Sequence, residues 1–440
     1  MPHQDQAGLA NALDWLAAPT MFGRYTFRSD CVWTPWSLVR VTLLWAWGEE
    51  STLTDRYAAA GEITRRLPDG QRELVSYQAF LKLLARHSGA LLFALLSMLQ
   101  RRLQQDLAGC YRVSGMLAFG VDGTRVELPR TAANQQAFAS PTCRTRKRGR
   151  RRRAAYKKAA NPQAWLTTLW HVGSGLPWMW RHGPSGSSER EHLLEMLASL
   201  PEPALLTADA GFVGYDFWRR LQEAGHDFLI RVGANVTLIK QLGYFREQEG
   251  RVYLWPDKSA RKRQPPIVLR LVIAQGGKRP VYLVTSVLTK SRLTDKQVIE
   301  LYRARWGVEV FYRSFKQTFA RRKLRSGSPV NAGVELDWSL AALTAACLYA
   351  KKLQVDHGES PQRTSVAGVL RVLRQAMRGV AIELPARLAH ALIDAYQRQN
   401  KASRDYPKKK PKYSGATPPK ILKATKLQVQ TANQLRGLTA

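Results

Sequence analysis

The sequence predicts an α/β protein whose core sheet is interrupted by an inserted β unit, with helical regions at both ends. Three observations lead to this fold class. Apolar residues recur every three or four positions through residues 77–103. Short apolar runs alternate with amphipathic segments between residues 115 and 233, and strands with turns fill residues 235–288.

The first part of the core begins with a buried strand. Residues 115–123 form an apolar run that reaches Asp122 and Gly123, and residues 124–130 are its expected hairpin partner. The elements expected next are strands at 164–173 and 176–183, a helix capped by Ser187 or Ser188, a strand at 204–209 that stops at Asp209, a helix at 215–225 closed by a glycine, and a strand at 227–233.

Beyond this alternation the pattern changes twice. Residues 235–288 read as an inserted β unit with a hairpin around 275–280, and helices are expected from Thr294 to about Tyr396. The expected units are a helical N-terminal arm (1–107), a first core segment (108–234), an inserted β subdomain (235–288), a second core segment (289–330), a helical C-terminal region as candidate dimerisation unit (331–400), and a basic tail (401–440) that we expect to be mobile without a partner.

The charge balance points to a polyanionic partner. The chain has 68 Lys and Arg against 33 Asp and Glu, a net charge of +35. This excess favours nucleic acid over a membrane surface or a simple contribution to solubility. The cysteines lack metal-binding spacing, no P-loop suggests a nucleotide cofactor, and the longest apolar stretches are too short to cross a bilayer. We therefore expect a cytoplasmic protein without a membrane partner.

A dense basic run stands between two expected strands. Ten Lys and Arg lie between Arg144 and Lys158, which is too much charge for a packed element. We expect a loop that contacts DNA phosphates independently of sequence, with a merely solvated loop as the alternative. The DNA-contacting candidates in this run are Arg146, Lys147, Arg148, Arg150, Arg151, Arg152 and Arg153.

Residues 302–317, YRARWGVEVFYRSFKQ, are expected to form one amphipathic helix. Tyr302, Arg305, Glu309 and Lys316 then fall within a sector of roughly 60°. Val308, Phe311, Phe315 and Phe319 form a separate apolar stripe. An acid among cations on a helix is consistent with an ordinary ion pair between residues four apart.

Two upstream acids favour a catalytic interpretation of Glu309. Asp122 and Asp209 each follow an apolar strand and precede a glycine-containing turn. The carboxyl ends of strands in α/β sheets are where sites are built, although such acids are often only turn formers or caps. Three carboxylates can hold two Mg²⁺ (or Mn²⁺) ions for phosphoryl transfer, and neighbouring Arg and Lys can bind the scissile phosphate.

The three motifs resemble those of DDE transposases of the bacterial insertion-sequence 4 type. The residues that carry the resemblance are VDGTRVELP at 121–129, LTADAGFVGYDF at 206–217, and the spacing Tyr302, Arg305, Glu309, Lys316. The resemblance covers about residues 110–325 and implies an RNase H-like mixed sheet flanked by helices. It implies that Asp122, Asp209 and Glu309 are catalytic and bind two metal ions.

The resemblance also implies a function and partners. It implies cut-and-paste transposition of an insertion sequence through a DNA hairpin, by a homodimer that pairs two element ends and inserts them into target DNA. Tyr302, Arg305, Arg313 and Lys316 would contact DNA, and Trp306 would stack on a displaced base unless it only packs. The alternatives are an RNase H-like nuclease or resolvase without strand transfer, and a catalytically silent DNA-binding relative.

Other side chains receive structural interpretations. Trp165, Trp170, Trp178 and Trp180 are expected to fill the sheet core rather than stack on bases. His171 and His182 are expected to be structural, because no zinc-ligand spacing surrounds them. Glu127, Asp216 and Asp337 are reserve acids for the site.

Overall fold

One mixed sheet organises the protein. The computed structural model describes residues 4–67, 75–139, 161–275, 280–393 and 417–437. The sheet has ten strands in the order β10-β6-β7-β8-β9-β5-β4-β1-β2-β3. Their bounds are β1 (Ala118–Glu127), β2 (Gln163–His171), β3 (Leu176–Gly183), β4 (Leu205–Ala208), β5 (Asp227–Val232), β6 (Thr237–Lys240), β7 (Arg251–Leu254), β8 (Ile267–Ala274), β9 (Val281–Thr285) and β10 (Lys420–Lys423).

The five strands β3-β2-β1-β4-β5 form the RNase H-like mixed sheet that the resemblance implies. β1, β2 and β3 are antiparallel neighbours, whereas β1, β4 and β5 run parallel. β4 is buried along its whole length, as expected for a parallel strand covered on both faces. The predicted strands at 164–173, 176–183, 204–209 and 227–233 are confirmed within a residue or two at their ends.

The prediction of a hairpin between residues 115–123 and 124–130 is wrong. β1 is one continuous strand, and it pairs with β2 from Phe119↔His171 to Glu127↔Gln163. Gly123, which suggested a turn, lies inside the strand. A Cβ at Gly123 would meet the Glu189 side chain, so the glycine here serves a close approach rather than a turn.

The inserted β unit continues the same sheet. β9 pairs with β5, and β8 and β9 form the predicted hairpin. The prediction of a mobile tail is wrong for its end: β10 pairs parallel to β6 and α16 (Lys426–Gly437) packs beside α9 (Asp257–Arg261). The Gln428 side chain donates to the Trp255 carbonyl at 3.1 Å and to Asp257 at 3.0 Å. Residues 401–416 lie outside the described residues.

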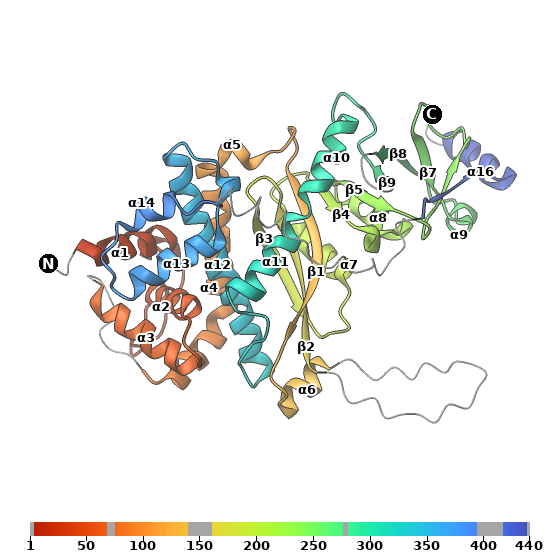
Figure 1. The fold of residues 1–440 in the computed structure, drawn as a ribbon. Coiled ribbons are helices and arrows are strands. Elements are labelled where there is room, and N and C mark those ends of the chain that lie inside the picture. Colours follow the sequence, from red (N-terminus) through yellow and green to blue (C-terminus); the bar gives the residue numbers. More distant parts are fainter. Residues whose placement is uncertain (1–3, 68–74, 140–160, 276–279, 394–416, 438–440) are drawn as a thin grey trace, which may run out of the picture.

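The helices form two groups that Figure 1 separates clearly. The first packs at the β3 end of the sheet: α1 (Gln4–Leu16), α2 (Pro35–Trp47), α3 (Leu53–Arg66), α4 (Tyr77–Asp106), α5 (Ala108–Tyr111), α12 (Pro329–Asp356), α13 (Val366–Met377) and α14 (Leu384–Ala389). The second belongs to the sheet itself: α6 (Ala132–Phe138), α7 (Glu189–Met196), α8 (Tyr215–Glu223), α10 (Asp295–Ala304) and α11 (Gly307–Arg313), which the π-helical η4 (Ser314–Thr318) extends.

The predicted N-terminal and C-terminal helical regions pack against each other. The Trp47 indole donates to the Ala342 carbonyl at 2.8 Å, and the Trp338 indole donates to the Ser88 hydroxyl at 2.8 Å. The first bond joins α12 to α2 across 295 residues of the chain, and the second joins α12 to α4 across 250 residues. α12 is therefore the central helix of this group, which explains why most of its residues are buried.

α4 differs from expectation in its length. By length and composition it would be able to cross a membrane, unlike the shorter apolar stretch read from the sequence. Its face with Phe80, Leu84, Leu91 and Leu95 is almost fully buried in the protein core. Over its most apolar 18-residue stretch as a whole, 33% of the residues are buried.

A buried arginine joins the helical group to the core. Arg321, only 2% exposed, donates to the Ala46 carbonyl at 2.6 Å, the Phe319 carbonyl at 3.0 Å and the Ser339 hydroxyl at 3.1 Å. These partners lie at the end of α2, after η4 and on α12. The guanidinium therefore connects the segment after η4 to both helices.

We predict that Arg321→Ala lowers the free energy of unfolding by about 3 kcal/mol, because each buried carbonyl left unpaired costs ~1–3 kcal/mol. Denaturant unfolding followed by circular dichroism measures this free energy of unfolding. Arg322→Ala is the matched control: Arg322 is exposed and pairs only at the surface with Glu127, so its loss should cost about 0.5 kcal/mol or less. Equal destabilisation by the two variants would contradict this role.

Candidate active site

Asp122 and Asp209 lie close to the point where the pairing of β1 with β4 ends. β1 and β4 are parallel neighbours, and their pairing ends at Gly120↔Thr207. Each aspartate stands two residues beyond that last pair, Asp122 still within β1 and Asp209 just after β4. Asp209 also accepts a hydrogen bond from the Gly211 amide at 2.7 Å, so the cap interpretation and a site role coexist.

The helix that carries Glu309 is broken, which corrects the prediction of one helix over 302–317. α10 ends at Ala304, and α11 begins at Gly307. At the break, two glycines lie close to neighbouring side chains. A Cβ on Gly307 would lie 2.9 Å from the Trp170 indole nitrogen, and one on Gly120 would lie 3.2 Å from Arg305 Cγ. The bend therefore allows α11 to sit directly on β1 and β2.

Two hydrogen bonds hold α11 and η4 on β1. The Tyr312 hydroxyl donates to the Asp122 carbonyl at 2.7 Å, and Lys316 Nζ donates to the Thr124 hydroxyl at 2.6 Å. The predicted apolar stripe of Val308, Phe311, Phe315 and Phe319 is confirmed as buried. These contacts position Glu309 toward the edge that carries the aspartates.

The three predicted acids interact electrostatically. Burial raises the pKa of Asp122 to about 6, and the charges of Glu309 and Asp209 add to that rise. The Gly123 amide and Arg305 act in the opposite direction. Arg305 also pairs with Glu309 at 3.4 Å. The ordinary ion pair is thus present, and the carboxylates nevertheless lie close enough to repel one another.

The donor chemistry of these acids fits divalent metal ions. Among the residues that the structure describes, no three acidic, histidine or cysteine side chains are spaced as a complete metal-ligand set. Carboxylate oxygens are the ligands that Mg²⁺ prefers. Burial is the main cause of the raised pKa of Asp122, and a cation would relieve the repulsion from Glu309 and Asp209 that adds to it. Asp122, Asp209 and Glu309 do not form such a set in this structure, so their role as metal ligands stays a prediction.

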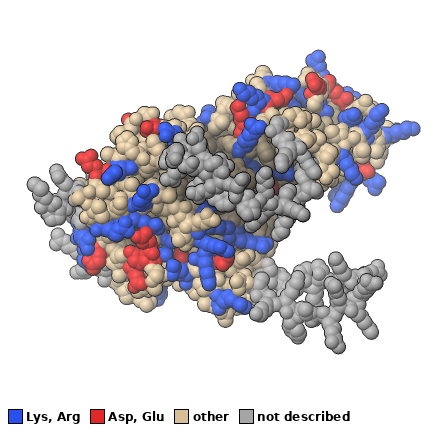
Figure 2. All heavy atoms as spheres, in the orientation of Figure 1, with Lys and Arg blue, Asp and Glu red and all other residues tan. Residues whose placement is uncertain are grey.

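The predicted DNA-contacting residues differ in accessibility. Trp306 is 53% exposed. Arg313 is exposed as well. Arg305 is only 6% exposed and stands 5.4 Å from the centre of the Tyr302 ring. In Figure 2, Lys and Arg side chains gather on the surface next to the position that α11 has in Figure 1. The run from Arg144 to Lys158 lies outside the described residues.

The remaining candidates have structural partners. His171 is buried and hydrogen-bonded to Ser174 and the Tyr111 carbonyl, as predicted. His182 pairs with Asp337 at 3.2 Å. Glu127 pairs with Arg322, and Asp216 is exposed in the first turn of α8. Of the four tryptophans, Trp170, Trp178 and Trp180 are buried as predicted, whereas Trp165 is half-buried beneath Arg125.

The sequence analysis missed a fourth acid. Glu189, the first residue of α7, is half-buried and interacts electrostatically with both Asp122 and Asp209. The sequence around it suggested only a capped helix. The available signal was Gly123 inside β1, since a glycine in a strand marks a close approach by another group.

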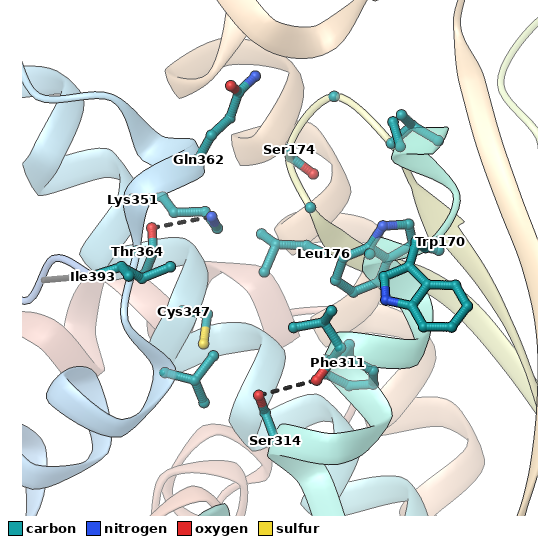
Figure 3. A pocket seen from close by; sticks show the side chains of 18 of the residues that line it. Trp170, Ser174, Leu176, Phe311, Ser314, Cys347, Lys351, Gln362, Thr364 and Ile393 are labelled. Atoms are coloured by element: carbon teal, nitrogen blue, oxygen red, sulfur yellow. Dashed lines mark hydrogen bonds between the residues drawn. The ribbon is translucent and has the colours of Figure 1, made fainter. Parts of the chain in front are cut away.

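A cavity of about 490 Å³ beside α11 is separate from the acids. Trp170, Leu176, Trp306 and Phe311 contribute to its mostly apolar wall, and none of its lining residues is acidic. Figure 3 shows the buried Lys351 at its side, hydrogen-bonded to Thr364 at 3.0 Å. The cavity therefore supplies no carboxylate ligand for a metal ion.

Comparisons with known proteins agree with the motifs. A family model described as "Transposase DDE domain" matches residues 114–345, more than half of the chain. Transposase InsG for insertion sequence element IS4 of Escherichia coli (strain K12) is 26% identical over 225 residues, which are 49% of this chain and 48% of that protein. The chain thus spans about half the length of this relative. Its similarity confirms the resemblance to the insertion-sequence 4 type.

A solved structure is similar in outline. The piggyBac transposase synaptic complex with hairpin DNA has a TM-score of 0.41 and 11% sequence identity, over 93% of this chain and 88% of that chain.

We predict that Asp122→Asn stabilises the metal-free protein at pH 7.5. Asp122 has a pKa of about 6 when folded against 3.8 ordinarily, so the unfolded chain releases its proton first. Its destabilising contribution therefore grows as pH rises from about 4 to 6 and is complete above 6. Unfolding in EDTA should show a gain of about 1–3 kcal/mol at pH 7.5 and none near pH 4.

The control for this prediction is Asp216→Asn, which changes an exposed acid in the same way. It should show no gain at either pH. A gain for Asp122→Asn that is the same at pH 4 and pH 7.5 would rule out electrostatic repulsion as its cause.

Proposed function

The chain belongs to the DDE transposase family, and we propose that it performs cut-and-paste transposition of an insertion sequence by two-metal-ion phosphodiester chemistry. The observation that carries the proposal is the placement of Asp122 and Asp209 two residues beyond the last pair of the parallel strands β1 and β4, with Glu309 of α11 close enough to raise the pKa of Asp122. Sequence-distant acids that converge in a protein of charge +35 are suited to reactions of nucleic acid phosphates.

Some side chains of the site would bind the metal ions, and others would bind the DNA. Two Mg²⁺ or Mn²⁺ ions, when bound, supply activation of the attacking oxygen and stabilisation of the leaving one. Asp122, Asp209 and Glu309 hold the ions. Tyr302 and Arg305 lie beside these acids. A phosphate that entered the site could replace Glu309 as the ion-pair partner of the Arg305 guanidinium.

Residues of α11 and its neighbours, of which Arg313 and Trp306 are exposed and Lys316 is half-buried, bind DNA outside the reacting centre. Arg313 and Lys316 contact phosphates, and the exposed Trp306 stacks on a base displaced when the DNA forms a hairpin. The partners are the two element ends and target DNA, paired by a homodimer. We expect the protein to act in the cytoplasm on the nucleoid, where its substrate lies.

A nuclease or resolvase with the same fold would cut the element ends without joining them. A silent relative would bind DNA without cutting. Incubation with labelled element ends and plasmid target DNA separates the three: joined product identifies a transposase, cleavage alone a nuclease, and binding alone a silent relative.

We predict that Glu309→Gln lowers cleavage of duplex DNA carrying the flanking inverted repeats by about 10³-fold, because a lost carboxylate ligand costs several kcal/mol of transition-state stabilisation. DNA affinity, measured by mobility shift, should change about twofold or less. Glu300→Gln on the exposed face of α10 is the matched control and should cleave normally. Normal cleavage by Glu309→Gln would show that the site is wrongly assigned.

We further predict that changing the Lys and Arg residues between Arg144 and Lys158 to Ser and Gly flattens the salt dependence of DNA affinity. Each phosphate contact contributes roughly 0.9 to the slope of log affinity against log salt. Titration from low to moderate salt measures this slope. An unchanged slope would identify the run as a solvated loop without contact to DNA.

A further inference from the structure

Glu189 approaches the site from the opposite side of β1 to α11. Neighbouring residues of a strand face opposite sides of the sheet, so Gly123 faces α7 when Asp122 faces α11. A Cβ on Gly123 would lie 2.2 Å from Glu189 Oε1 and 2.7 Å from its Cδ. The missing side chain is therefore what allows the Glu189 carboxylate to rest against the backbone beside Asp122.

The next residue ties α7 to the turn that carries Asp209. Arg190 Nε donates to the Gly211 carbonyl at 2.8 Å, and the Gly211 amide donates to Asp209 at 2.7 Å. Ser188 caps the helix just before them, through the Glu191 amide. The start of α7 thus contacts both aspartate-bearing segments, which fixes the direction in which Glu189 points.

Within the described part of the chain, the charge of Glu189 is offset only in part, by the neighbouring Arg190. Its carboxylate accepts no hydrogen bond and forms no ion pair there. Burial raises its pKa to about 7, and the charges of Asp122 and then Asp209 add to the rise. Glu191, two residues later on the same helix, is exposed instead. A half-buried acid directed at two other acids costs stability unless a cation joins them.

We propose that Glu189 is a fourth carboxylate of the divalent-ion site, added from α7 to the set of Asp122, Asp209 and Glu309. The inference rests on the proposed function, because phosphoryl transfer is what brings ions to this edge of the sheet. Mg²⁺ retains several waters in protein sites. Glu189 therefore binds an ion directly or accepts a hydrogen bond from one of its waters.

The test measures Mn²⁺ binding to the full-length protein without DNA, by the loss of the free-ion signal in electron paramagnetic resonance. Glu189→Gln should weaken Mn²⁺ affinity about 10-fold, the lower end of the range for residues that support a metal site. Glu191→Gln, which removes the same charge from the same helical turn, should leave affinity within about twofold. Gly123→Ala should weaken affinity like Glu189→Gln, because the added methyl displaces the carboxylate without changing any charge.

Asp122→Asn separates failure of this inference from failure of the proposed site. If Asp122→Asn abolishes Mn²⁺ binding while Glu189→Gln and Gly123→Ala both bind as tightly as the parent, Glu189 is not part of the site and the inference is overturned. If Asp122→Asn also binds Mn²⁺ normally, the metal site itself is misplaced and the proposed function falls with it. Far-UV circular dichroism establishes that each variant is folded.

Discussion

The seating of α11 on β1 is the contact on which the site depends. It brings Glu309 close to Asp122 and Asp209, which lie just beyond the last pair of β1 and β4. Several close interactions hold it there: the Tyr312 hydroxyl on the Asp122 carbonyl, Lys316 on Thr124, and the packing of Gly307 on Trp170. Because the glycine has no side chain, α11 approaches the sheet closely, and the hydrogen bonds set its position along β1.

This seating concentrates negative charge in a partly buried place. Burial and neighbouring acids raise the pKa of both Asp122 and Glu189, so the site weakens the fold that contains it. Such destabilisation is common where side chains are arranged for chemistry rather than stability. In a protein of charge +35, the acids form a local exception to the positive charge.

Buried contacts elsewhere in the molecule connect the helices to one another and to the sheet. α12 is buried along most of its length and links to α2 and α4 through the Trp47 and Trp338 indoles. Arg321 then joins this helical group to the segment after η4. At the other end, β10 and α16 return from the C-terminus to cover the edge of the inserted strands, which protects β6 from unwanted pairing.

Local patterns in the sequence determined four of the core strands and the buried stripe of Val308, Phe311, Phe315 and Phe319, whereas the selection of Asp122, Asp209 and Glu309 rested on the resemblance of three motifs to a known family. The strands and the stripe depend on which neighbours along the chain are apolar, and periodicity reports that directly. Tertiary structure alone decided the continuity of β1, the break between α10 and α11, the return of β10, and the approach of Glu189 to Gly123. Each of these is set by a partner distant in the chain, whose position depends on packing that no local pattern records.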